Sequence, residues 1–121
     1  MTKEERREYF KRPEVREKIN KRRQTPKYRD KARRSWLLRT YGITLEEYNK
    51  QLELQDGKCA ICNCLPETSF RGTLGVDHDH ITGQVRGLLC RNCNQAIGLL
   101  QDSPVVLKQA TDYLIKYKLK Q

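Results

Sequence analysis

The fold of this chain is decided by residues 59–94, which read CAICNCLPETSFRGTLGVDHDHITGQVRGLLCRNCN. Two CxxC motifs, Cys59/Cys62 and Cys90/Cys93, are separated by 27 residues. A two-residue spacer lets both sulfurs of a pair reach one ion from a tight turn, and two such turns supply the four thiolates of a closed tetrahedral zinc site. The spacing therefore predicts one structural zinc ion bound by these four cysteines.

The composition favours a metal over disulfides at these positions. The chain has 121 residues, of which 36% are hydrophobic and 33% are charged. A core this small usually needs disulfides or a bound metal to stabilise it. The start, MTKEERREYF, is charged where a signal peptide would be apolar, and no stretch is apolar enough to span a membrane. We therefore expect an intracellular, reducing, cytoplasmic environment. Redox pairs or unligated core cysteines are the alternatives, and Cys64 is either a competing ligand or, preferably, a free thiol without function.

The segment between the cysteine pairs predicts a β-hairpin. Residues 74–80 and 84–89 read as short strands joined by a glycine-containing turn at 81–83, and a helix is expected from about Arg91 to Leu100. Further helices are predicted over 27–41, from Thr44, and from Pro104. The buried face of the last helix would hold Val106, Ala110, Tyr113, Leu114 and Tyr117. The fold class is therefore small α+β, with zinc clamping the base of the hairpin.

Both histidines of the chain fall within residues 76–80, VDHDH. In a straight strand Asp77 and Asp79 point one way and His78 and His80 the other. Phosphodiester hydrolysis needs a base for water, a cation for the developing charge, and in-line positioning. His78 suits the base, and the oxygens of Asp77 and Asn94 suit a hard ion such as Mg²⁺ or Mn²⁺. An exposed turn, with Asn94 as a simple helix cap, is the alternative without catalysis.

These motifs, in this order, resemble the recombination endonuclease VII family of the HNH, or ββα-metal, nucleases. The resemblance covers about residues 40–115 and rests on the stretches 59–62, 76–80 and 85–94. It implies an HNH-like ββα-metal core in which Asp77 and Asn94 bind the catalytic metal and His78 activates water. It also implies that His80 assists at the phosphate or the metal, and that the products carry 5′-phosphate and 3′-hydroxyl ends.

The chain departs from the family pattern in three ways. Gly75 stands where some members carry another histidine, and Ile97 stands where some carry an acid. Members that resolve branched DNA also have a long C-terminal helical extension, whereas this chain ends at Gln121. The junction specificity of those members is therefore not carried over to this chain, and branched DNA stands only as an alternative to duplex DNA.

The positive charge is concentrated in the first third of the sequence. Residues 1–40 carry 16 of the 25 Lys and Arg and 6 of the 15 Asp and Glu, whereas residues 41–121 carry nine of each. This predicts a basic, DNA-binding N-terminal arm and helix over 1–40, helical or disordered in its first part, and a zinc-bound nuclease domain over 41–121. The arginines expected at DNA phosphates are Arg22, Arg23, Arg29, Arg33, Arg34 and, unless it pairs with a local acid, Arg86.

The sequence thus predicts a metal-dependent DNA endonuclease or nickase. A non-catalytic zinc-ribbon DNA-binding protein would need the cysteines and the basic arm, but not Asp77, His78 and Asn94 together. A nuclease of the same fold directed at RNA is a further alternative. One catalytic centre cuts one strand at a time, so double-strand cleavage would require a homodimer or two visits.

Overall fold

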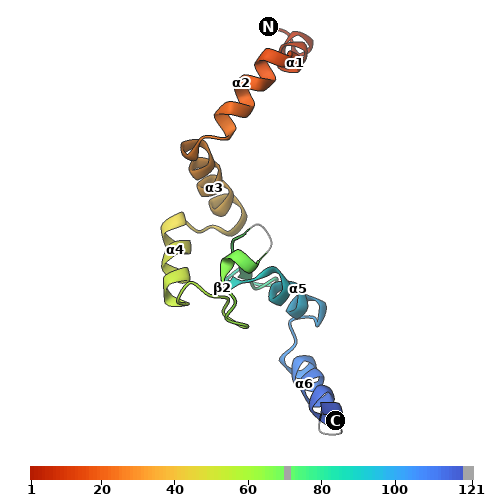
Figure 1. The fold of residues 1–121 in the computed structure, drawn as a ribbon. Coiled ribbons are helices and arrows are strands. Elements are labelled where there is room, and N and C mark those ends of the chain that lie inside the picture. The colour runs from red at the N-terminus through yellow and green to blue at the C-terminus, as the bar shows by residue number, and fades with distance from the viewer. Residues whose placement is uncertain (70–71, 119–121) are drawn as a thin grey trace. The chain divides into compact units, whose positions relative to one another are not determined.

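The computed structural model describes residues 1–69 and 72–118. Within these ranges the chain forms six α-helices, a short 3-10 helix and one two-stranded antiparallel sheet (Figure 1). It divides into two compact units, Met1–Leu45 and Glu46–Gln121. The predicted small α+β class is confirmed. None of the described helices combines the length and apolarity that crossing a membrane requires.

The first unit consists of helices whose ends are set by local signals. α1 (Lys3–Lys11) begins with a capping box, in which Thr2 and Glu5 each bind the other's backbone N–H. α2 (Pro13–Arg23) and α3 (Pro26–Tyr41) both begin on a proline, where a missing N–H costs nothing. α1 and α2 bury none of their residues. The predicted basic arm is thus helical, and capping rather than a core defines its helices.

The second unit is built around the hairpin of β1 (Gly75–His78) and β2 (Val85–Leu89). α4 (Leu45–Leu54) and the 3-10 helix η1 (Pro66–Thr68) precede the hairpin. α5 (Arg91–Leu99) follows it and packs on both strands, and α6 (Pro104–Lys118) comes last. Among the described residues of this unit, Asp77 is a buried acid, and the buried apolar side chains are Tyr48, Cys59, Leu74, Val76, Leu88, Leu89 and Cys90.

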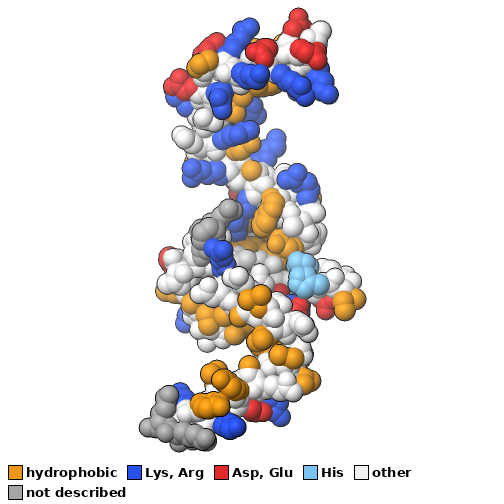
Figure 2. Space-filling model, turned by 90° about the vertical axis from the view of Figure 1, so that its right-hand side faces the viewer, with side chains coloured by type: hydrophobic (Ala, Val, Ile, Leu, Met, Phe, Trp, Pro, Cys, Tyr) orange, Lys and Arg blue, Asp and Glu red, His pale blue; other side chains and the backbone are white. Residues whose placement is uncertain are grey.

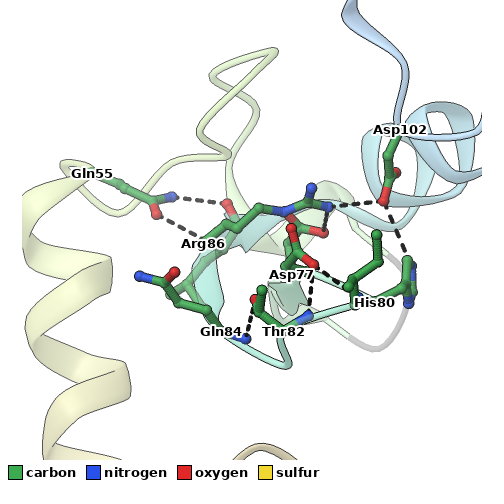
Figure 3. Close-up of polar contacts among 10 residues, drawn as sticks. Gln55, Asp77, His80, Thr82, Gln84, Arg86 and Asp102 are labelled. Atoms are coloured by element: carbon green, nitrogen blue, oxygen red, sulfur yellow. Dashed lines mark hydrogen bonds and ion pairs between the residues drawn. The ribbon is translucent and has the colours of Figure 1, made fainter.

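The side chain of Gln55 forms hydrogen bonds with the backbone of β2. Gln55 Nε2 donates to the carbonyl oxygens of Leu88 and Lys58, both at 2.9 Å, and Gln55 Oε1 accepts from Leu88 N at 3.0 Å. Leu88 is fully buried, so water cannot satisfy its backbone N–H. The residue that follows α4 therefore fixes the hairpin through polar contacts that the apolar pattern did not predict (Figure 3).

The prediction for the last helix is right about its start and wrong about its buried face. α6 begins at Pro104 as expected, and Val106 and Ala110 are half-buried. Tyr113, Leu114 and Tyr117, however, are 62%, 65% and 49% exposed. Within the described ranges too little of the unit packs against the C-terminal half of α6 to cover these side chains.

Candidate functional site

Four cysteine sulfurs gather beside the hairpin. The Sγ atoms of Cys59, Cys62, Cys64 and Cys90 all lie within 4.8 Å of one another, and those of Cys62 and Cys90 are 3.7 Å apart. A tetrahedral site with zinc–sulfur bonds of about 2.3 Å has sulfur–sulfur edges of about 3.8 Å. The sulfur spacing therefore fits a zinc ion, and the cluster could hold one.

Backbone amides around the cluster point at its sulfurs. Cys59 Sγ accepts a hydrogen bond from Cys90 N at 3.3 Å, and Cys90 Sγ accepts one from Cys93 N at 3.4 Å. Burial opposes ionisation of Cys59, but amide hydrogen bonds from Cys62 and Cys90 outweigh it and lower the pKa of the thiol to about 6. Since metals bind the thiolate, such a sulfur loses little affinity to protons near neutral pH.

The four clustered sulfurs are not the four that the CxxC spacing predicts. Cys59, Cys62 and Cys90 belong to both sets, but Cys64 stands in the cluster where Cys93 was expected. Cys93 lines the adjoining cavity of about 670 Å³ together with Cys62, Cys64 and Cys90, and burial raises the pKa of its thiol. The structure thus brings five thiols to one place, and the position of Cys64 suits the competing ligand that was its alternative role.

A β-bulge directs Arg86 onto Asp77. The strands pair Asp77 with Gly87 and His78 with Val85, so Arg86 is an extra residue on β2. Arg86 donates from Nε to Asp77 Oδ2 at 2.7 Å and from Nη2 to Asp77 Oδ1 at 2.8 Å (Figure 3). Asp77 is only 7% exposed, and these bonds compensate its buried charge and raise the pKa of Arg86. Arg86 therefore pairs with a local acid, one of its two predicted roles.

The bulge also separates the two acids of the VDHDH stretch. Asp79 Oδ1 accepts hydrogen bonds from the backbone N–H groups of Thr82 at 2.9 Å and Ile81 at 2.8 Å, which lower the pKa of Asp79. Asp79 thus shapes the hairpin turn, whereas Asp77 faces Arg86. The alternation expected for a straight strand ends at the bulge. The rings of His78 and His80 lie together, with centroids 4.8 Å apart, and histidine side chains reach the surface (Figure 2).

Asn94 lies in the first turn of α5 and faces the strand that carries Asp77. Its Nδ2 atom would be 3.8 Å from a Cβ atom placed on Gly75. Gly75 precedes Asp77 by two residues in β1 and so shares its face. The fold therefore brings the carboxylate of Asp77 and the amide of Asn94 to one face of β1. This donor set suits a hard divalent cation, although Arg86 engages both carboxylate oxygens.

Asp102 is a site residue that sequence reasoning missed. Its Oδ2 lies 3.3 Å from Arg86 Nη2 and 3.8 Å from His80 Nε2. Together with Asp79, His80 and Arg86 it lines a cavity of about 390 Å³. A lone acid just beyond the end of a helix forms no motif, so nothing in the sequence marks it. Only the fold brings it to the hairpin.

Apart from Arg86 on β2, the arginines predicted to contact DNA lie on α2 and α3 of the first unit. Arg22 and Arg23 end α2, and Arg29 and Arg33 are one turn apart on α3. Arg34 forms an ion pair with Asp30 at 2.8 Å. Figure 2 shows Lys and Arg side chains over much of the visible surface of these helices. The whole net charge of +10 belongs to Met1–Leu45, since residues 46–121 carry nine basic and nine acidic residues.

Comparison with known proteins identifies the family. The family model described as recombination endonuclease VII matches residues 34–116, and this chain belongs to that family. The Gene 59 proteins of Mycobacterium phages D29 and L5 are 50% and 46% identical to it over 86 and 85 residues, or 68% and 67% of this chain. The chain spans about half the length of these curated relatives, 51% of each. No solved structure matches it.

Proposed function

We propose that this protein is a metal-dependent DNA endonuclease or nickase with an HNH-type, ββα-metal active site. β1, β2 and α5 would supply the two strands and the helix of that core. The observation that carries the proposal is the placement of Asp77, His78 and Asn94 on this one hairpin and helix, beside the cysteine cluster. Membership of the recombination endonuclease VII family supports the same chemistry.

Each side chain has a role that suits its chemistry. His78 would accept a proton from the attacking water, since the pKa of an imidazole lies near working pH. Asp77 and Asn94 would hold Mg²⁺ or Mn²⁺, an ion that supplies positive charge to the phosphate and the leaving oxygen. His80, exposed beside His78, would hydrogen-bond the scissile phosphate. Attack on phosphorus with cleavage of the bond to the 3′ oxygen leaves 5′-phosphate and 3′-hydroxyl ends.

A structural zinc ion would hold this arrangement together. Cys90 is the N-cap of α5, and Asn94 lies one turn further along the same helix. An ion that fixes Cys90 would therefore also fix the amide of Asn94 over β1. We propose Cys59, Cys62, Cys90 and Cys93 as its ligands, because two CxxC turns approach one ion from opposite sides, and we regard Cys64 as the competing fourth ligand.

DNA binding is proposed to come mainly from Met1–Leu45. Its net charge of +10 would attract a polyanion, whereas the second unit has no net charge. Arg22, Arg23, Arg29 and Arg33 would neutralise phosphates without reading sequence. Duplex DNA is the proposed substrate, and branched DNA and a homodimer that cuts both strands are the finer alternatives.

The experiment compares variants of the full, zinc-loaded chain on a labelled linear duplex and a labelled four-way junction of matched sequence. With Mg²⁺ at saturating protein, His78→Ala should cut about 10²–10⁴-fold more slowly than the wild type. Asp77→Asn and Asn94→Ala should also cleave DNA more slowly than the wild type. Asp79→Asn is the matched control, because Asp79 lies in the same hairpin but serves the turn, and it should cut at nearly the wild-type rate. The ratio of junction to duplex cleavage measures any branched preference.

The result also decides between the two functional classes. A wild-type chain that binds both DNAs but cuts neither with Mg²⁺ or Mn²⁺ would be a zinc-containing DNA-binding protein. Loss of cutting in His78→Ala with unchanged DNA affinity and zinc content would support the nuclease.

A further inference from the structure

A chain of ion pairs links the proposed cation ligand to an acid outside the hairpin. Arg86 Nη2 lies 2.8 Å from Asp77 Oδ1 and 3.3 Å from Asp102 Oδ2. Figure 3 shows the guanidinium between the two carboxylates, with His80 on the far side of Asp102. One arginine is therefore shared by two acids, and it holds Asp77 with two nitrogens and Asp102 with one.

The guanidinium and a divalent cation compete for the same atoms. Both oxygens of Asp77 accept hydrogen bonds from Arg86. A cation that binds Asp77 needs at least one of these oxygens and repels the positive guanidinium. The Arg86 side chain is 35% exposed, so it is not locked in place by packing. Binding of the cation therefore favours release of Asp77 by Arg86.

Asp102 has the features of a second partner for Arg86. Its Oδ1 is buried and has no hydrogen-bond partner within the described part of the chain, and such an oxygen costs free energy. Gln101 and Asp102 both have left-handed backbone, with φ of +60° and +51°, which non-glycine residues seldom adopt. Asp102 N also donates to Ile97 O at 2.8 Å. The turn after α5 thus holds the Asp102 carboxylate in place while its Oδ1 accepts no hydrogen bond within the described residues.

We propose that Asp102 is a positioning residue that receives Arg86 when a divalent cation binds Asp77. This inference rests on the proposed function, because it takes Asp77 as a cation ligand. Without the cation, Arg86 neutralises the buried Asp77. With the cation bound, Arg86 turns onto Asp102 with both nitrogens, fills Oδ1 and remains beside His80, where a scissile phosphate would lie. Asp102 therefore favours cation binding by accepting the displaced charge.

The test is a double-mutant cycle read by Mn²⁺ affinity instead of cleavage. Free Mn²⁺ is followed by electron paramagnetic resonance during titration into the zinc-loaded, full-length chain. Arg86→Gln removes the competitor and should tighten binding about fivefold or more, and Asp102→Asn should weaken it by a similar factor. In the Arg86→Gln background, Asp102→Asn should change the affinity less than about twofold, since no displaced arginine remains to be received.

Two further variants serve as controls for the cycle. Arg86→Lys keeps a positive charge beside the buried carboxylate but lacks the planar fork, so its Mn²⁺ affinity should lie between those of the wild type and Arg86→Gln. Asp79→Asn should leave Mn²⁺ affinity unchanged. Zinc content and circular dichroism verify that each variant is folded.

The inference is overturned if Asp102→Asn weakens Mn²⁺ binding equally in both backgrounds, because Asp102 would then act through its own charge. It is also overturned if neither Arg86 variant tightens binding. Asp77→Asn separates this failure from that of the proposed function. If Asp77→Asn binds Mn²⁺ as tightly as the wild type, the cation site lies elsewhere and both proposals fail. If it loses Mn²⁺ while the cycle shows no coupling, the inference alone fails.

Discussion

Replacing Gln55 with Ala tests how the second unit holds its hairpin. The change removes the acceptor of Leu88 N and the donor to the carbonyl oxygens of Leu88 and Lys58. Leu88 O keeps a hydrogen bond from Ala60 N at 3.2 Å, but the buried Leu88 N loses its partner. An orphaned buried amide costs about 1–3 kcal/mol and the other lost bonds about 0.5–1.5 kcal/mol, so we expect a loss of about 2–4 kcal/mol.

Thermal unfolding of the zinc-loaded chain, followed by circular dichroism, measures this loss. For a unit of this size 1 kcal/mol shifts Tm by about 4–8 °C, so Gln55→Ala should unfold at least about 8 °C below the wild type. Gln51→Ala is the matched control, because it removes a single bond to Gln55 Oε1 at 3.0 Å and should cost less than about 1 kcal/mol. Gln55→Glu keeps the acceptor but sets a carboxylate against two carbonyls, and should destabilise at least as much as Ala. Equal Tm values for Gln55→Ala and Gln51→Ala would refute the reasoning.

Two further predictions concern the zinc site and the N-terminal helices. Cys93→Ser should lose the zinc that metal analysis finds in the wild type, about one equivalent, and should unfold the second unit, whereas Cys64→Ser should keep both zinc and fold; the reverse pattern would make Cys64 the fourth ligand. Deleting residues 1–26, which carry ten basic and five acidic residues, should flatten the slope of log DNA affinity against log salt by about 4–5 if about five phosphate contacts are lost, with zinc content unchanged. An unchanged slope would assign DNA binding to α3.

Local signals in the sequence predicted most elements of the second unit. Pro104 marks a helix start, because proline fits the first turn of a helix. The turn before Gln84 was predicted from Gly83, which has a φ of +76°. The CxxC motifs predicted that Cys59, Cys62 and Cys90 would meet, because two such turns can supply thiolates to one ion, and the structure brings these three sulfurs together. These inferences depend on neighbours in the sequence.

The polar contacts of the site could not be predicted, since they depend on geometry across elements. One extra residue in β2 turns Arg86 onto Asp77, and no residue type marks a bulge of this kind. Asp102 and Gln55 reach the hairpin from loops beyond α5 and α4, and each looks like an ordinary surface residue in the sequence. The apolar spacing of α6 led to a wrong prediction of burial, because periodicity shows that a helix has an apolar face but does not show whether another element packs against that face.

The central claim, that a divalent cation and His78 cleave DNA at this hairpin, is tested most directly on supercoiled plasmid. The zinc-loaded chain is incubated with plasmid in the presence and absence of Mg²⁺, beside His78→Ala at a concentration that binds the same amount of DNA. We predict open circles only with Mg²⁺ and the wild-type chain, and DNA ligase should reseal them because the nicks carry 5′-phosphate and 3′-hydroxyl ends. Nicking by His78→Ala at the wild-type rate, or plasmid left supercoiled by the wild-type chain with both Mg²⁺ and Mn²⁺, would contradict the account.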